Sequence, residues 1–208
     1  MLGYEGLERL GLGAHEEIEV MLLYAGYSRA MATNAQSEFE TPHTISVEEY
    51  LPTAYSPDCD YVDGRVEERN SGEFDHASIQ AILCFRLREL AQRLSIRVLP
   101  ELRMRVSRTR FRIPDVCVML KSQKPERVPT TPPFLCIEIV SSDDRMSRLM
   151  VRVKEYLAFG VTYVWVIDPQ SRTGYVYTKD EGREVRDCLT TANPDISISL
   201  SELFAELD

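Results

Sequence analysis

Two stretches, Phe111-Arg-Ile-Pro-Asp-Val-Cys-Val-Met-Leu120 and Phe134-Leu-Cys-Ile-Glu-Ile-Val140, decide how this chain folds. Both are rich in the β-branched and large apolar residues that are typical of buried strands. Each contains one carboxylate, Asp115 or Glu138, and an ionised carboxylate is costly to bury unless a cation meets it. Two such groups on consecutive strands predict a shared divalent metal, and oxygen ligands suit Mg²⁺ or Mn²⁺. The alternative is that each carboxylate pairs with an arginine or lies at a wet strand end.

Two long helices are predicted on either side of these strands. The first runs from about residue 75 to about residue 94, with leucine and isoleucine at steps of three and four residues. The second runs from about residue 144 to residue 159. A serine or aspartate among residues 141–143 can cap its start, and Gly160 can end it.

Further strands complete a mixed α/β (α+β) pattern. Residues 98–106 alternate between apolar and charged side chains, residues 161–167 are almost wholly apolar, and Gly174 introduces a later hairpin. Asp63-Gly64 lies between two short strand-like runs and predicts an N-terminal β-hairpin. The order helix, three strands, helix, strand implies a central mixed sheet with helices on both faces.

The chain divides into two unequal parts. Residues 1–43 form a poorly anchored N-terminal extension and linker, and residues 44–208 form a single domain, beginning with a short helix that Ser46 can cap. The first residues are acidic where a signal peptide would be basic, and no apolar run approaches the roughly 20 residues that span a bilayer. We therefore expect no membrane association.

Composition restricts the partners and the compartment. The net charge of −9 and the sequence pI near 5.0 argue against indiscriminate nucleic-acid binding, although arginines cluster locally at residues 86–97 and 103–112. The five cysteines form an odd number and no Cys-x-x-Cys pair, which favours reduced thiols in a cytoplasmic protein.

A proline before Asp115, with Glu138 on the next strand, resembles the PD-(D/E)XK nuclease superfamily. The pattern is most similar to its Uma-type restriction endonuclease family, over roughly residues 45–180. The residues behind this resemblance are Tyr61-Val-Asp-Gly64, Asp75-His76, Arg112-Ile-Pro-Asp-Val116, Cys136-Ile-Glu-Ile-Val-Ser141, Tyr156-Leu-Ala-Phe-Gly-Val161 and Tyr163-Val-Trp-Val-Ile-Asp-Pro169.

This resemblance implies a restriction-endonuclease-like core and Mg²⁺-dependent (or Mn²⁺-dependent) hydrolysis of phosphodiester bonds in DNA. Asp115 and Glu138 would hold the metal, and a lysine would be expected two residues after Glu138, where this chain has Val140. In the Uma-type family the basic residue lies on the following helix, four residues before a tyrosine. That position is Arg152, and Lys154 lies two residues further on.

Helix geometry separates these two catalytic candidates. At 3.6 residues per turn, Arg152 and Lys154 lie about 160° apart, so one of them, not both, is expected to face the carboxylates. We favour Arg152, which lies about 40° from Tyr156. An arginine cannot act as a base near neutral pH but can clamp a phosphate through two hydrogen bonds.

Other side chains are secondary candidates. Glu101 is a candidate third metal ligand, since it projects from the polar face of the predicted strand, and an ion pair with an arginine is the alternative. Glu67 and Glu68 are weaker candidates. His76, at the start of the first helix, and Arg103 are predicted to bind substrate. A capping or packing role for His76 and a solvated position for Arg103 are the alternatives.

Three functions therefore remain at this point. The first is a metal-dependent DNA endonuclease. The second is a catalytically inactive nucleic-acid-binding or protein-interaction module on the same fold, which the Val140 and Arg152 substitutions and the acidic composition favour. The third is a regulatory or structural protein without a nucleic-acid role. DNA is the expected partner, and a homodimer is an open alternative.

We expect residues 1–30 to be dispensable for folding, because the family resemblance begins only near Ser46 and Met31 opens a polar stretch like an ordinary chain start. A shortened protein that begins at Met31 should therefore melt at the same temperature as the full chain in differential scanning calorimetry. A markedly lower melting temperature would contradict this.

Overall fold

The computed structural model describes residues 44–69, 73–142 and 145–208 of the 208-residue chain. The predicted N-terminal extension, residues 1–43, lies outside these described ranges. None of the helices within them is both long and apolar enough to cross a membrane. All five cysteines are free thiols, in agreement with the sequence.

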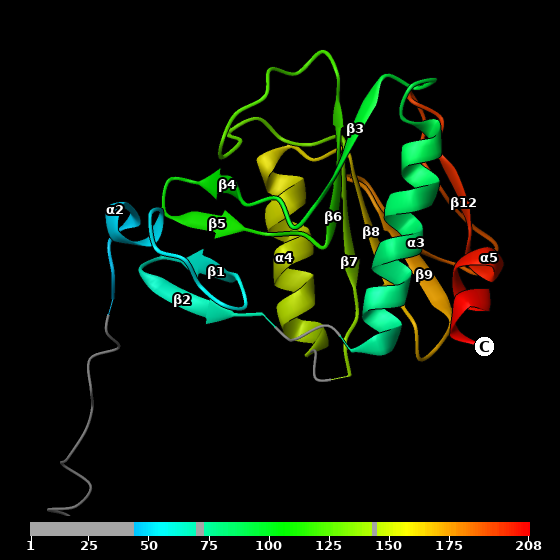
Figure 1. The fold of residues 1–208 in the computed structure, drawn as a ribbon, viewed down its shortest axis with the longest axis horizontal. Coiled ribbons are helices and arrows are strands. Elements are labelled where there is room, and N and C mark those ends of the chain that lie inside the picture. The colour runs from blue at the N-terminus through cyan, green and yellow to red at the C-terminus, as the bar shows by residue number, and fades with distance from the viewer. Residues whose placement is uncertain (1–43, 70–72, 143–144) are drawn as a thin grey trace, which may run out of the picture. The chain divides into compact units, whose positions relative to one another are not determined.

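The centre of the fold is a six-stranded mixed sheet (Figure 1). Only the β7–β8 pair is parallel among its described strands, and α4 forms the crossover that this pair requires. The strand order is β10 (Gly182–Val185), β9 (Thr173–Tyr177), β8 (Tyr163–Asp168), β7 (Leu135–Ile139), β6 (Val116–Leu120) and β3 (Ile96–Pro100).

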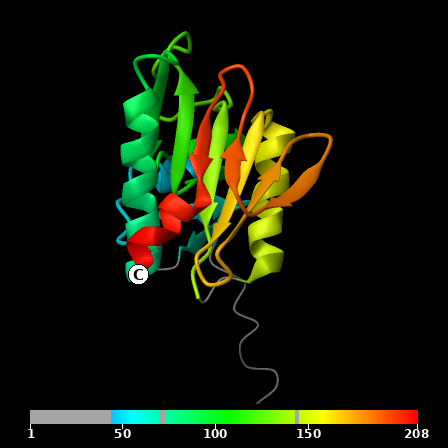
Figure 2. The ribbon, with the colours of Figure 1, turned by 90° about the vertical axis from the view of Figure 1, so that its right-hand side faces the viewer.

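The two long helices cover opposite faces of this sheet, as Figure 2 shows. Helix α3 (Phe74–Leu90) packs on one face together with α5 (Leu200–Phe204), and α4 (Met146–Phe159) packs on the other. Because successive strand residues point to opposite faces, Ile137 of β7 joins the α3 core whereas Cys136 joins the α4 core. The predicted sheet with helices on both faces is confirmed.

A second, four-stranded antiparallel sheet has the order β2, β1, β5, β4. The predicted hairpin is confirmed: Asp63 and Gly64, with φ of 49° and 93°, connect β1 to β2, and such left-handed residues suit a two-residue hairpin turn. Ser46 caps the short helix α2, as predicted. The bounds are α2 Val47–Tyr50, β1 Cys59–Val62, β2 Arg65–Glu68, β4 Met104–Ser107 and β5 Arg110–Arg112.

The predicted single strand over residues 98–106 is wrong. The chain turns at Glu101, where φ is 49°, so that β3 belongs to the six-stranded sheet and β4 to the four-stranded sheet. The chain returns between the sheets just before β6, and Pro114 occupies this connection because it has no N–H to donate to a strand ladder. Pro100, directly before the turn, is the local signal that the alternating pattern of residues 98–106 obscured.

The helix ends agree with the sequence in part. Helix α3 ends at Leu90, four residues before the predicted end, and α4 begins at Met146, with Arg145 as an N-cap whose side chain makes no capping bond. Gly160 ends α4 with φ of 110°, as predicted. The C-terminal region adds the β11–β12 pair (Cys188–Thr190 and Ser197–Ser199) and the 3₁₀-helix η2 (Ala205–Leu207).

Candidate active site

Strand register places Asp115 opposite Glu138. In the antiparallel β6–β7 pair, Val116 lies across from Ile137. Asp115 directly precedes Val116 and Glu138 directly follows Ile137, so the two carboxylate residues come next to each other at the same end of the pair. Both carboxylates lie on the face that α4 covers, and only 3% of Asp115 and 2% of Glu138 is exposed. The backbone N–H of Ile139 donates to Asp115 Oδ2 over 2.7 Å. The two residues are thus neighbours at this end of the sheet, and the metal that they are predicted to share stays a prediction.

Three further groups hold Asp115. Arg69, which follows β2, forms an ion pair with Oδ1, and His76 Nε2 in the first turn of α3 lies 3.2 Å from Oδ2. Gln80, one turn further along α3, donates to the Asp115 backbone carbonyl over 2.9 Å. Burial alone would raise the pKa of Asp115, but the His76 hydrogen bond and the Arg69 charge lower it below its ordinary value.

Glu138 receives its partners from α4. Arg152 Nε lies 3.0 Å from Oε2, and the Tyr156 hydroxyl donates to Oε1 over 2.6 Å. Burial raises the pKa of Glu138 to about 7, against the opposing charge of Arg152 and together with the repulsion of Asp115. The two neighbouring carboxylates thus have pKa values pushed in opposite directions, a pattern typical of functional sites.

A second buried ionic network lies beside this pair and is centred on Arg112. Its guanidinium contacts Asp60 over 2.8 Å, Glu67 over 2.9 Å and Glu155 of α4 over 2.6 Å. Burial raises the pKa of Asp60, and the charge of Arg112 opposes that rise. Arg110 links Glu155 to the hairpin turn. These contacts attach the four-stranded sheet to α4.

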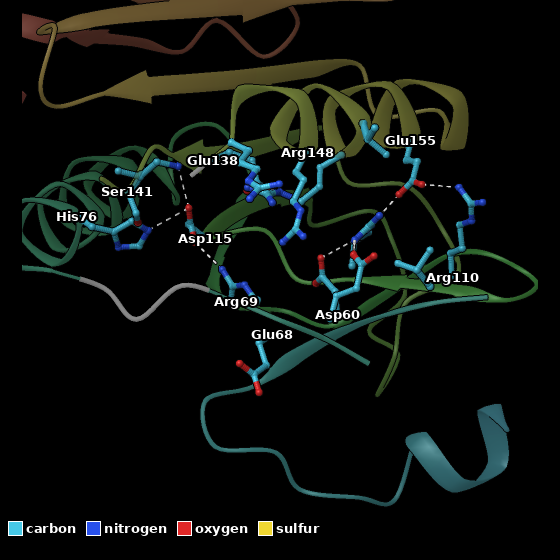
Figure 3. A pocket seen from close by; sticks show the side chains of 17 residues that line it. Asp60, Glu68, Arg69, His76, Arg110, Asp115, Glu138, Ser141, Arg148 and Glu155 are labelled. Atoms are coloured by element: carbon cyan, nitrogen blue, oxygen red, sulfur yellow. Dashed lines mark hydrogen bonds and ion pairs between the residues drawn. The ribbon is translucent and has the colours of Figure 1, made fainter. Parts of the chain in front are cut away.

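The two networks share one cavity of about 390 Å³ (Figure 3). His76 and Asp115 lie toward one end of it, and Arg110 and Glu155 of the second network lie toward the other. Its charged lining consists of Asp60, Glu67, Glu68, Asp115, Glu138 and Glu155 with Arg69, His76, Arg110, Arg112, Arg145, Arg148 and Arg152.

The cavity contains some predicted site residues and omits others. Arg152 contacts Glu138, whereas Lys154 is exposed and does not line the cavity, so the predicted choice between them agrees with the structure. Glu101 is exposed and lies outside the lining. Arg103 pairs instead with Asp58 and stacks over the ring of Tyr50, 4.7 Å from its centroid.

Sequence reasoning did not single out Arg69 and Asp60. Asp60 sits in a four-residue strand whose pattern gives no indication that its carboxylate meets Arg112, 52 positions away. Arg69 directly follows the hairpin, and only the fold brings it to Asp115. The weaker candidates Glu67 and Glu68 do line the cavity, and the signal for them was that they lead into the helix that carries His76.

The donor set suits Mg²⁺ better than a metal with a full protein cage. Within the described ranges, no three His, Cys, Asp or Glu side chains cluster as a metal site. Mg²⁺ keeps several waters and is commonly held by one or two carboxylates together with substrate phosphates. Asp115 and Glu138 supply two carboxylates at the wall of a cavity with room for those waters.

Comparison with known proteins identifies the family of the chain and a solved structure with the same fold. The sequence model of the Uma2 family, described as "Putative restriction endonuclease", matches residues 47–208. A crystal structure of a putative nuclease belonging to DUF820 from Anabaena variabilis superimposes with a TM-score of 0.71 and 21% identity, over 79% of this chain and 99% of that one. This likeness shows a shared fold.

Two other results complete the comparison. A cryo-electron microscopy structure of a DrdV–DNA complex matches with a TM-score of 0.38 and 16% identity, over 62% of this chain and 11% of that one. No curated protein sequence matches the chain.

The raised pKa of Glu138 predicts a pH-dependent stability in the metal-free protein. Between its ordinary pKa of 4.5 and about 7, the folded state keeps a proton that the unfolded chain has released. Stability from this group is thus complete below pH 4.5 and is lost as pH rises through 7. Glu138→Gln removes this titrating group. The free energy of unfolding of the variant minus that of the wild type should therefore increase between pH 5 and pH 8, by up to about 3 kcal/mol.

Urea unfolding of both proteins in EDTA at several pH values measures this difference. Comparing the two proteins cancels the other titrating groups. A stability difference that stays constant from pH 5 to pH 8 would show that Glu138 titrates at its ordinary pKa.

Proposed function

Because this chain belongs to the Uma2 family, described as "Putative restriction endonuclease", we propose that it is a metal-dependent endonuclease that hydrolyses phosphodiester bonds in DNA. Asp115 and Glu138 hold Mg²⁺ or Mn²⁺. One observation carries the proposal: the two carboxylates are buried, face each other on one side of the sheet, and line a cavity rich in arginine.

The bound metal would supply electrostatic stabilisation of the phosphate and a lower pKa for an attacking water. The surrounding side chains set the charge of the Asp115 and Glu138 carboxylates before the metal binds. The lowered pKa of Asp115 keeps this carboxylate ionised at neutral pH, whereas the raised pKa of Glu138 requires it to lose a proton when it becomes a ligand. Metal affinity should therefore increase with pH through neutrality.

The neighbouring side chains have separate roles in this proposal. Arg69 and His76 hold Asp115 in place, and Tyr156 holds Glu138 through its hydroxyl. Arg152 Nε lies 3.0 Å from Glu138 Oε2. A phosphate that binds beside the Glu138 carboxylate therefore contacts the Arg152 guanidinium as well. Its guanidinium stabilises the charge that develops on the phosphate, as the lysine does in the superfamily pattern, but without acting as a base.

We further propose that residues 44–208 form the complete endonuclease-like domain and that residues 1–43 do not contribute to it. Both sheets and all the residues of the cavity lie within the larger part. Cleavage by the shortened protein that begins at Met31 is expected to equal that of the full chain.

One observation favours a second candidate function, a nucleic-acid-binding module without cleavage. The basic side chains that line the cavity, in the part of the chain that the structure describes, are arginines and one histidine, and none is a lysine. Such a site can hold phosphates yet lack the group that assists deprotonation of water. The two candidates differ in metal dependence, since a binding module has no need of a divalent ion.

Isothermal titration with Mn²⁺ and Mg²⁺ tests the metal site. The wild type should bind the metal, and Asp115→Asn, which keeps the size of the side chain, should lose that binding and all plasmid cleavage. Glu101→Gln is the matched control, because Glu101 is a neighbour whose backbone N–H donates to the Asp115 carbonyl, but its carboxylate is exposed and lies outside the cavity. Equal metal binding by wild type and Asp115→Asn would overturn the assignment.

The basic residue gives a second prediction. Arg152→Lys should retain or increase nicking of plasmid DNA, because a lysine keeps the positive charge and can lose its proton when buried. Arg152→Ala should lower the rate about a hundredfold, the scale of losing one charge stabiliser in a transition state. Lys154→Ala should be nearly neutral because Lys154 is exposed.

Circular dichroism of each variant checks that the fold is kept. Loss of nicking in Lys154→Ala but not in Arg152→Ala would reverse the assignment. Absence of nicking by the wild type with either metal, combined with DNA binding, would favour the non-cleaving module.

A further inference from the structure

The arginines of the cavity fall into two groups according to their partners. Four of the six are committed to carboxylates: Arg69 to Asp115, Arg152 to Glu138, and Arg110 and Arg112 to the network around Glu155. Arg145 and Arg148 line the same cavity, but neither has an ion pair with any residue that the structure describes. Among the residues that the structure describes, these two positive charges are therefore uncompensated.

Arg148 lies on the same side of α4 as Arg152, because a spacing of four residues keeps the two within about 40° of each other around the helix axis. Arg145 is the N-cap residue, directly before the first turn of α4. Along the axis, Arg148 lies about 6 Å and Arg145 about 10 Å from Arg152, toward the helix N-terminus. Arg148 extends from α4 into the cavity with no interaction drawn to it, while Glu68 lies at the opposite side (Figure 3).

This arrangement forms a line of positive charge that starts at the carboxylate pair and leads away from it. Both side chains are exposed, so their guanidinium groups remain hydrated and available for an external anion. A single phosphodiester at Asp115 and Glu138 would meet Arg152 and leave the other two arginines unused. A polynucleotide has further phosphates along the strand, and arginine is well suited to bind phosphate oxygens through paired hydrogen bonds.

We infer that Arg145 and Arg148 form a phosphate track that binds the backbone phosphates flanking the scissile one, which makes a polynucleotide, rather than a small phosphodiester, the substrate class. The inference rests on the proposed function for the position of the scissile phosphate. The track positions the strand and takes no part in the bond cleavage. The N-terminal end of α4, at which Arg145 lies, adds favourable partial positive charge.

DNA binding measured against salt concentration tests the track. Fluorescence anisotropy with a labelled duplex, in Ca²⁺ to prevent cleavage, gives the slope of log affinity against log salt. Arg145→Gln and Arg148→Gln should each make the slope less steep by about 0.9, and the double variant by about 1.8, because each phosphate contact releases counterions. Arg93→Gln is the matched control. Arg93 is an exposed arginine that follows the C-terminal end of α3, whereas His76 of the cavity lies at the N-terminal end of that helix.

A second measurement separates positioning from catalysis. Hydrolysis of bis(4-nitrophenyl) phosphate, which has one phosphate, should be unchanged in the double variant with Mn²⁺, whereas the KM for duplex DNA should rise at least tenfold and kcat should stay the same. An equal loss of rate for both substrates would place the arginines at the scissile phosphate and overturn the track.

The remaining outcomes distinguish this inference from the function on which it rests. A double variant that binds duplex with the wild-type affinity and salt slope, in a protein that still nicks plasmid DNA, overturns the track and leaves the endonuclease proposal intact. A wild type that binds no DNA at any salt concentration overturns both.

Discussion

The burial of two facing carboxylates is the constraint on which the arrangement of this protein depends. Asp115 and Glu138 meet across the β6–β7 register at the end of an otherwise apolar sheet, and removing an ion from water costs several kcal/mol unless partners replace the solvent. Separate parts of the chain supply those partners. Arg69 follows the hairpin, His76 begins α3, and Arg152 and Tyr156 come from α4. The carboxylate pair thus connects elements that share no apolar core.

The Arg112 network extends the same principle to the second sheet. The α4 core includes Met104 and Val106 of β4, but the inner strand β1 contacts α4 through charge: Asp60 of β1 and Glu155 of α4 both bind the buried Arg112. Ion pairs require particular directions, whereas apolar contacts tolerate sliding. The network therefore fixes the distance between the hairpin sheet and α4, which are the two walls of the cavity.

Local patterns predicted much of this fold, and the rest depends on contacts between distant residues. The Asp63-Gly64 turn, Gly160 at the end of α4 and the alternation that places Glu138 on the α4 face all follow from rules spanning a few residues. The turn at Glu101 was missed, because the alternation of residues 101–106 outweighed the signal of Pro100, directly before the point where the backbone changes sheets. Arg69 was equally hidden, since its partner Asp115 is 46 positions away. Helix periodicity, by contrast, correctly separated Arg152 from Lys154.

Arg152 meets Glu138 from helix α4, whereas the resemblance to the PD-(D/E)XK pattern predicted a lysine on the strand, at position 140. Val140 shares the strand parity of Cys136 and Glu138, and it packs against the α4 core, so a lysine there would also lie on the α4 face. Helix α4 packs on that same face of the sheet, and its Arg152 forms an ion pair with Glu138. A cation can therefore reach this carboxylate from the strand or from the helix. In the proposed function Arg152 would place a positive charge near the phosphate, but it would not accept a proton, because arginine stays protonated. A bound metal would supply the lower pKa of the attacking water, and Glu138, whose pKa is raised by its burial under α4, would have to lose its proton to serve as a ligand.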